Sequence, residues 1–150
     1  MKTLVIIDMQ EAYLGDDSYS LLQRVVHLIH EFGRKRWPII LVEYDCACSD
    51  TDQEIIDALW EYEDLVKVVH KERVSGAAEV LYELRRTQWP KDLVVAGVYG
   101  NCCVSATVDW LVKLEPKINV EVRTDCIWPE YAYYECLDEE QQERIQFVGG

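Results

Sequence analysis

Short apolar runs alternate with longer segments of helical periodicity along the whole chain. The apolar runs are rich in Val, Ile and Leu, and they predict buried β-strands at residues 2–8, 39–44, 65–70, 93–98 and 118–123. A short edge strand at 147–148 is a further candidate. Apolar residues three and four positions apart predict helices at 20–36, 52–62, 103–114 and 135–144, and at 75–87, where Ser75 is the expected N-cap.

The alternation of strands and helices predicts how the chain is arranged in space. Parallel strands require crossover connections, and a helix after each strand covers the faces of the sheet. We therefore expect an α/β fold: a three-layer α/β/α architecture with a doubly wound, mostly parallel sheet of five to six strands. With 150 residues and no linker or internal repeat, the chain is expected to form a single domain over residues 1–150.

Three reactive side chains lie at the predicted carboxyl ends of strands, where doubly wound proteins form their sites. Asp8 ends the first strand, Lys71 ends the third, and Cys103 follows the fourth at the start of a helix. A helix N-terminus favours a thiolate, and a nucleophilic thiol also requires a cationic neighbour and a base. Lys71 and Asp8 would supply these two. Each residue alone is commonly structural, so the prediction of a site depends on the three together.

The composition narrows the classes of function. A net charge of −13 disfavours binding to nucleic acid or to an anionic membrane. No apolar stretch approaches the ~20 residues of a membrane span, and the first residues lack a signal-peptide pattern, so a cytoplasmic location is expected. The six cysteines are expected to be free thiols. With only three histidines, and with Cys46 and Cys48 too close for a zinc knuckle, neither a metal site nor a cofactor is expected.

Three segments resemble the isochorismatase-like cysteine hydrolases, a family of nicotinamidase-related amidohydrolases, in their order and spacing. They are residues 4–13, 69–77 and 96–107, and residues 120–125 resemble the strand that ends in an aspartate in this family. The resemblance implies that Asp8, Lys71 and Cys103 form the Asp-Lys-Cys triad of the family. Cys102 is the neighbouring alternative, but the residues that follow Cys103, Thr107 among them, match the pattern after the family's nucleophile.

The resemblance also implies a mechanism. Asp8 would take the proton of Cys103, Lys71 would stabilise the thiolate, and the thiolate would attack a small amide or a related C–N bond to give a thioester. A cis peptide bond would join Val98 to Tyr99. The backbone N–H groups of Tyr99 and Cys103 would then form the oxyanion hole.

The expected partner is a small-molecule amide substrate, and aromatic side chains are the candidates for binding it. Tyr13, Tyr44 and Tyr99 are the predicted substrate-binding residues, with Trp128 or Tyr131 as further candidates. Arg73, two residues after Lys71, would bind a substrate carboxylate or form a surface ion pair.

The chain departs from the family pattern at several positions. Gly100 stands where relatives usually carry Thr or Asp, which predicts a looser loop, and Trp110 stands where they often carry Asp. Asp109 is one position early and is not taken as its equivalent. No Asp-x-His motif follows the second strand, so a metal-dependent nicotinamidase is disfavoured. Isochorismatase proper lacks the nucleophilic cysteine, so Cys103 points away from vinyl-ether hydrolysis.

Two other classes of function remain open. The short loops and Gly100 would suit a catalytically silent binding or assembly protein, whereas the adjacent Cys102 and Cys103 would suit a thiol-based redox sensor. The intact triad favours the hydrolase, because a protein without catalysis has little need of all three groups. The resemblance further implies a homo-oligomer, either a dimer or a tetramer, with the aromatic-rich residues 127–134 as a candidate interface.

Overall fold

A six-stranded sheet with all strands parallel organises the chain in the computed structural model, which describes residues 1–149. The strand order is β3-β2-β1-β4-β5-β6. The strands are β1 (Thr3–Ile7), β2 (Ile39–Tyr44), β3 (Val66–Lys71), β4 (Asp92–Val98), β5 (Asn119–Trp128) and β6 (Ile145–Val148). The helices are α1 (Tyr19–Arg34), α2 (Gln53–Trp60), α3 (Ala77–Thr87), α4 (Cys103–Leu114) and α5 (Glu139–Glu143).

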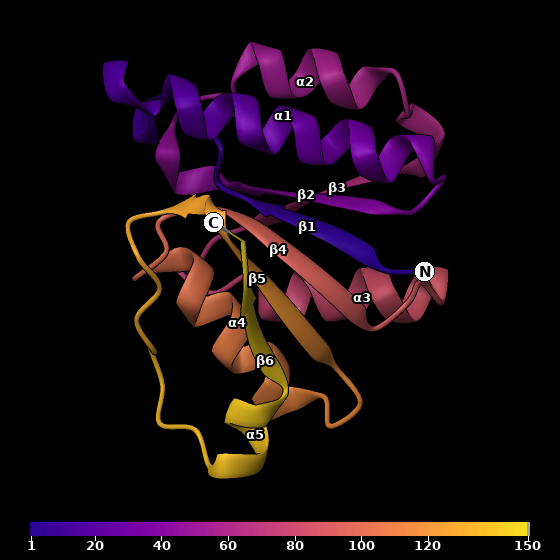
Figure 1. Cartoon of the computed structure of the whole chain (residues 1–150), viewed down its shortest axis with the longest axis vertical. Helices are drawn as coiled ribbons and strands as arrows, with labels where there is room; N and C mark the ends of the chain where they lie inside the picture. Colours follow the sequence, from indigo (N-terminus) through magenta and orange to yellow (C-terminus); the bar gives the residue numbers. More distant parts are fainter. Residues whose placement is uncertain (150) are drawn as a thin grey trace.

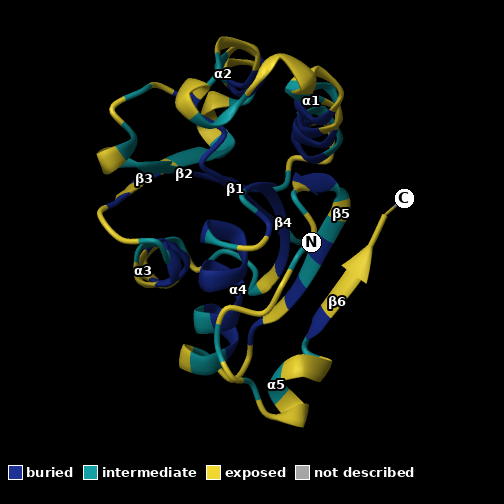
Figure 2. Ribbon diagram, turned by 90° about the vertical axis from the view of Figure 1, so that its left-hand side faces the viewer, coloured by how far each residue is buried: buried dark blue, intermediate teal, exposed yellow. Residues whose placement is uncertain are grey.

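Helices cover both faces of the sheet, with α1 and α2 on one side and α3 and α4 on the other (Figure 1). Successive strand residues point to opposite faces. Leu4 and Ile6 of β1 therefore pack with α1 and α2, while Val5 and Ile7 pack with α3 and α4. Figure 2 shows the buried strands between helices whose outer faces are exposed. The predicted three-layer α/β/α fold is confirmed.

The strand order reverses between β1 and β4, which lie side by side at the centre of the sheet. The chain winds outward from β1 through β2 to β3, then returns and winds outward from β4 through β5 to β6. At such a reversal the loops after the two central strands diverge and leave room for a ligand at the carboxyl edge. The residues that follow these two strands include Asp8 and Cys103.

Two predicted boundaries in the C-terminal part are wrong. The fifth strand was predicted to end at residue 123, but it passes through a bulge in its pairing with β4 and continues to Trp128. Val122 lies opposite Val95, but Ile127 lies opposite Gly97, so residues 123–126 form the bulge. Its polar residues end the apolar run in the sequence while the strand resumes beyond them.

The last helix was predicted at residues 135–144, but α5 comprises only Glu139–Glu143. Asp138 begins it with a capping box: its carboxylate accepts from the N–H of Gln141 at 2.8 Å, and the Gln141 side chain accepts from the N–H of Asp138 at 3.0 Å. We call residues 129–138, which form an irregular connection along the outside of α4 (Figure 1), the strap.

The predicted N-cap of the third helix is also displaced by one residue. The N-cap of α3 is Gly76, and the Ser75 hydroxyl accepts from the N–H of Ala77 at 3.1 Å.

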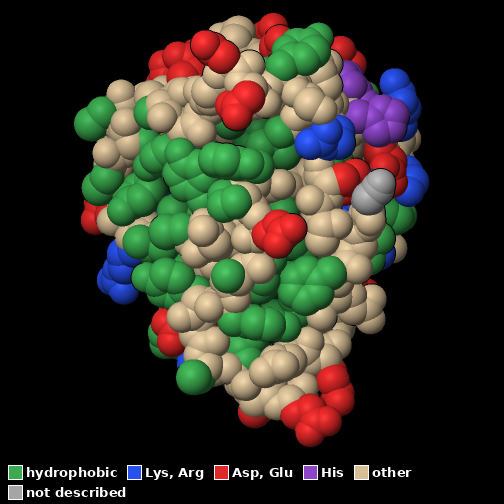
Figure 3. All heavy atoms as spheres, turned by 60° about the vertical axis from the view of Figure 1, so that its left-hand side comes forward, with side chains coloured by type: hydrophobic (Ala, Val, Ile, Leu, Met, Phe, Trp, Pro, Cys, Tyr) green, Lys and Arg blue, Asp and Glu red, His purple; other side chains and the backbone are tan. Residues whose placement is uncertain are grey.

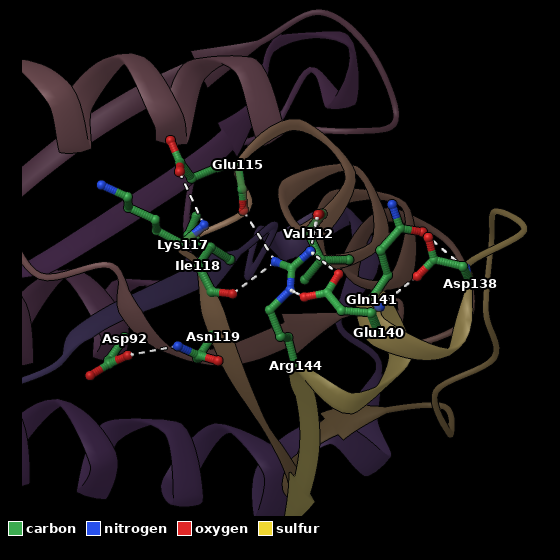
Figure 4. Close-up of polar contacts among 10 residues, drawn as sticks. All are labelled: Asp92, Val112, Glu115, Lys117, Ile118, Asn119, Asp138, Glu140, Gln141 and Arg144. Carbon is green, nitrogen blue, oxygen red and sulfur yellow. Dashed lines mark hydrogen bonds and ion pairs between the residues drawn. The ribbon is translucent and has the colours of Figure 1, made fainter.

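Arg144 attaches the C-terminal segment to the end of α4 (Figure 4). Its guanidinium donates to the carbonyls of Val112 at 2.7 Å, Ile118 at 3.0 Å and Glu115 at 3.1 Å. Carbonyls at a helix C-terminus lack helical partners, and a cation complements the helix dipole there. Residues after Arg144 then form β6 at the sheet edge, which confirms the predicted edge strand. Within residues 1–149, no helix combines the length and apolar character of a membrane span.

Candidate active site

Asp8, Lys71 and Cys103 meet at the carboxyl edge of the sheet, although they come from three separate strand ends. Lys71 Nζ lies 3.0 Å from Asp8 Oδ2, and the two side chains are 0% and 1% exposed. Cys103 is the first residue of α4 and is 6% exposed. Its thiol is close enough to Asp8 for each group to shift the pKa of the other. The sequence-based grouping of these three residues therefore agrees with the geometry.

Asp8 leaves β1 with a φ of 54°, in the left-handed region that few residues other than glycine adopt. Its N–H donates to the carbonyl of Val42 at 3.0 Å, so the turn remains attached to β2. Both carboxylate oxygens are buried, and neither accepts a hydrogen bond within residues 1–149; Oδ2 has only its ion pair with Lys71. A strained backbone that presents an underused carboxylate is typical of a functional position.

Lys71 is held by one ion pair and two hydrogen bonds. It pairs with Asp8, and its ammonium group donates to the carbonyl of Val74 at 2.7 Å and to that of Arg73 at 3.2 Å. Its Nζ also lies 4.1 Å from the centre of the Tyr44 ring, in a cation–π contact. A buried ammonium is tolerated when it is paired with an opposite charge and hydrogen-bonded. Lys71 is therefore a fixed cation in this site.

The electrostatics of Asp8 and Cys103 follow mainly from their burial. Burial raises the pKa of Asp8, and the nearby Lys71 ammonium offsets only part of that rise. Burial and the negative charge of Asp8 raise the pKa of Cys103 to about 12, again against Lys71. Burial and the Asp8 carboxylate thus act on the pKa of Cys103 in the direction opposite to the helix N-terminus and Lys71. A helix N-terminus and one cation do not compensate for loss of solvent beside a carboxylate.

Two backbone N–H groups near the thiol are unused. The Val98–Tyr99 peptide bond is cis, as the resemblance implied. Among the described residues, neither the N–H of Tyr99 nor that of Cys103 donates a hydrogen bond, whereas the carbonyl of Tyr99 accepts from Cys102 and Val104, both at 3.0 Å. Cys103 is the first residue of its helix, so its N–H has no partner within the helix.

The tyrosines predicted to bind substrate surround the triad. The Tyr99 hydroxyl donates to the carbonyl of Tyr13 at 3.3 Å, and their rings meet edge to face with centres 5.6 Å apart. Burial, and after it the negative charge of Asp8, raises the pKa of Tyr13 to about 12. Tyr44 covers Lys71.

The further aromatic candidates separate into two groups. Trp128 packs edge to face on Tyr99, with ring centres 5.8 Å apart. It therefore extends the surface formed by the rings of Tyr13 and Tyr99, which we call the aromatic wall. Tyr131 instead packs against Phe147 and donates from its hydroxyl to Asp109, so it belongs to the strap. The Arg73 side chain is exposed and lines a separate hollow of about 390 Å³ with Trp110. Only the carbonyl of Arg73 contacts the triad.

Gly100 does not loosen its loop, contrary to the prediction from the sequence. A Cβ at this position would lie 2.0 Å from the carbonyl oxygen of Pro129. The N–H of Gly100 donates to the carbonyl of Trp128 at 3.0 Å. The backbone at the start of the strap therefore occupies the space that a side chain would take. Glycine is required here by this close approach.

Several residues around the site were missed or left without a role in the sequence analysis. Gln10 is 2% exposed, and its side chain bonds to both backbone groups of Tyr44, at 2.8 Å to the N–H and 3.1 Å to the carbonyl. Asp109 is fully buried and accepts from Tyr131, from the N–H of Tyr134 at 2.6 Å and from that of Glu135 at 3.0 Å. A polar residue inside an apolar helical stretch was the available signal for Asp109.

Within residues 1–149, no three His, Cys, Asp or Glu side chains are grouped as a metal ion would require. His70 contacts Asp45, with Nδ1 and Oδ1 3.0 Å apart, at the rim of the sheet beside Tyr44. All six cysteines have free thiols, as predicted.

Comparison with known proteins agrees with this geometry. A model of the isochorismatase domain matches residues 2–127 of the chain. The chain therefore belongs to the isochorismatase family of hydrolases, which confirms the family and the enzyme class predicted from the sequence. A sequence search among curated proteins finds no match.

Solved structures of similar fold include a nicotinamidase from Staphylococcus aureus, 12% identical, with 98% of both chains covered and a TM-score of 0.75. A pyrazinamidase/nicotinamidase from Streptococcus mutans is 15% identical over 99% of this chain and 100% of that chain, with a TM-score of 0.74. An N-carbamoylsarcosine amidase from Thermoplasma acidophilum is 16% identical over 98% of this chain and 95% of that chain, with a TM-score of 0.72. At these identities the likeness concerns the fold.

Proposed function

We propose that this protein hydrolyses a small amide or a related C–N bond through a thioester on Cys103, with Asp8 as the general acid and base. The observation that carries the proposal is the buried Asp8–Lys71 pair beside the Cys103 thiol. The unused N–H groups of Tyr99 and Cys103 and the surrounding tyrosines support it. Amidases among the structures of similar fold support the substrate class.

The reaction begins with transfer of the Cys103 proton to Asp8 as the sulfur attacks the carbonyl carbon. The new C–S bond converts the carbonyl oxygen to an oxyanion, which the N–H groups of Tyr99 and Cys103 stabilise. The C–N bond then breaks, and Asp8 returns the proton to the departing nitrogen. Ammonia or an amine leaves, and Cys103 holds the acyl group as a thioester.

Water completes the cycle. Asp8 takes a proton from the water as its oxygen attacks the thioester carbonyl, the C–S bond breaks, and the proton passes from Asp8 to the sulfur. The carboxylic acid leaves and the neutral thiol is restored. Lys71 keeps its proton throughout and stabilises negative charge on Asp8 and on the sulfur.

The raised pKa values of Cys103 and Asp8 suit this sequence. Because the raised pKa keeps Cys103 a neutral thiol at rest, its proton passes to Asp8 in the same step in which the sulfur attacks. A carboxylate with a raised pKa is a stronger base than an exposed one, so Asp8 accepts this proton more readily. The low exposure of the site also strengthens each electrostatic contact within it. The aromatic wall of Tyr13 and Tyr99 fits a small, planar, uncharged group.

Release of ammonia or amine from a panel of small aliphatic and aromatic amides tests the proposal. Cys103→Ala is expected to abolish turnover, and Cys102→Ala is expected to keep most of it. Equal losses in the two variants would contradict the assignment of the nucleophile. Folded protein with no turnover on any amide of the panel would favour a catalytically silent relative.

We also propose that the chain forms a dimer or tetramer through aromatic residues at the end of β5, in the strap and in β6. Trp128 is 55% exposed, and Tyr133 and Phe147 are each 46% exposed. Figure 3 shows hydrophobic side chains gathered over a broad area of one face. Light scattering of the native chain and of the double variant Tyr133→Ser/Phe147→Ser tests this. A native chain that remains monomeric at high concentration would contradict it.

A further inference from the structure

Lys71 depends on a backbone loop for both of its hydrogen bonds. The two acceptors are carbonyls of the loop at residues 72–76, which connects β3 to α3. We call this segment the lysine loop. Carbonyls are the same in every residue type, so the position of the Lys71 ammonium is decided by whatever holds this loop in place.

Thr107 holds the lysine loop to the helix that carries Cys103. Its Oγ1 accepts a hydrogen bond from the N–H of Gly76 at 2.9 Å, and both residues are buried. Thr107 lies four residues after Cys103 on α4, so the two side chains lie on the same face of the helix, one turn apart. Helix α4 therefore holds both groups: its first residue carries the thiol, and one turn later Thr107 binds the lysine loop.

The packing at Gly76 leaves this loop little freedom to adopt another position. A Cβ on Gly76 would lie 3.2 Å from Lys71 Cδ, 3.2 Å from Val42 Cγ1 and 3.7 Å from Thr107 Oγ1. The stem of Lys71 thus fills the space beside Gly76 that a side chain would take, and the N–H of Gly76 is bound to the hydroxyl of Thr107. Without the Thr107 acceptor, a buried N–H would lose its partner, and the loop would have to move to recover one.

We infer that Thr107 is a positioning residue for Lys71, acting through the N–H of Gly76 and the carbonyls of the lysine loop. The inference rests on the proposed function, because it assigns Lys71 the role of the fixed cation of the triad. It adds a residue that touches neither the substrate nor the reacting atoms. It also explains how the separation of Lys71 from Cys103 is maintained between two different strand ends.

A matched set of variants separates this role from a general contribution to stability. Thr107→Val keeps the shape of the side chain and removes the acceptor, and Thr107→Ser keeps the acceptor. Thr3→Val is the control, because Thr3 is also fully buried and makes one hydroxyl bond, to the carbonyl of Pro90 at 2.8 Å, at the amino end of β1. Lys71→Met shows the effect of losing the cation itself.

The measurement is the rate of iodoacetamide alkylation at Cys103, mapped by mass spectrometry from pH 7 to 10, with thermal unfolding recorded for every variant. A displaced ammonium favours the thiolate less, so Thr107→Val should shift the rate profile to higher pH, in the direction of Lys71→Met. We expect a rate at fixed pH roughly three- to tenfold lower, as follows from a shift of up to about one pKa unit. Thr107→Ser should retain the native rate profile. Thr3→Val should lower the thermal stability without changing the rate profile.

The outcomes distinguish this inference from the proposed function. If Lys71→Met shifts the profile but Thr107→Val behaves like Thr3→Val, the role of Thr107 is refuted and the triad stands. A Thr107→Ser profile as shifted as that of the valine variant would also refute it. An unchanged profile in folded Lys71→Met would overturn both. If Thr107→Val does not fold, Thr107→Ala is compared with Thr107→Ser by the same criterion.

Discussion

Lys71 Nζ lies 3.0 Å from Asp8 Oδ2, with both side chains almost completely removed from solvent. This pair joins the end of β3 to the end of β1, two strands apart in the sheet. The ammonium and the carboxylate compensate for each other's burial, and the Cys103 thiol shares their enclosure. Because the three groups are coupled, a change in one is expected to alter the other two.

Asp8→Asn should change catalysis and thiol reactivity in opposite directions. Loss of the general base should lower the rate of ammonia release roughly 10²- to 10⁴-fold. The negative charge of Asp8 raises the pKa of Cys103, so its removal should make the thiol easier to ionise and faster to alkylate. Steady-state kinetics and iodoacetamide mapping on the same preparation check this. A fall in both rates would show that Asp8 mainly maintains the structure.

The acid side of the activity profile should reflect the raised pKa of Asp8. Asp8 must be ionised to accept the Cys103 proton, so kcat/KM should fall as pH drops through the pKa of this carboxyl. Burial raises that pKa, so the midpoint should lie above the value of about 3.9 for an exposed aspartate. Since Lys71 lowers the pKa of Asp8, any residual activity of Lys71→Met should show a midpoint at still higher pH. A midpoint at or below the ordinary value would exclude Asp8 as the base.

Gly100→Ala should destabilise the loop between β4 and α4. The new Cβ would meet the carbonyl oxygen of Pro129 at 2.0 Å, and backbone cannot move aside as a side chain can. We expect a loss of about 1–3 kcal/mol in the free energy of unfolding, together with reduced turnover. Gly15→Ala is the control, since Gly15 is exposed and its Cβ would meet only the Asp17 side chain, at 3.1 Å. Equal unfolding free energies for the two variants would contradict the close packing at Gly100.

Asp109→Ala should release the strap from α4. The substitution leaves the N–H groups of Tyr134 and Glu135 and the Tyr131 hydroxyl without their acceptor. Loss of the acceptor of three partly buried bonds should lower the free energy of unfolding by about 1–3 kcal/mol and make the strap more susceptible to chymotrypsin. Asp92→Ala provides a control, because this exposed carboxylate makes one bond, to Asn119 at 3.3 Å. Strap cleavage no faster than in Asp92→Ala would argue against this role of Asp109.

Much of the fold could be predicted from local pattern, because burial imposes a periodicity on each element. The run at Ile39–Tyr44 and the helix at Cys103–Leu114 have the predicted bounds. The predicted bounds were wrong where the periodicity of apolar residues does not follow the secondary structure. Residues 123–125 of the bulge are polar although the strand continues. Residues 135–138 were predicted as helix, but Asp109 binds the backbone N–H groups of Tyr134 and Glu135 and holds this segment in an irregular conformation.

The sequence by itself determined the alternating elements, and with them a parallel sheet whose strand ends carry Asp8, Lys71 and Cys103. Tertiary structure decided the strand order that brings these ends together and the direction of the pKa shift of Cys103. It also decided the bonds from Thr107 to Gly76 and from Asp109 to the strap. Periodicity reports only whether a position is buried. Desolvation and hydrogen bonds between distant residues depend on which other groups are enclosed with it, and only the folded chain specifies them.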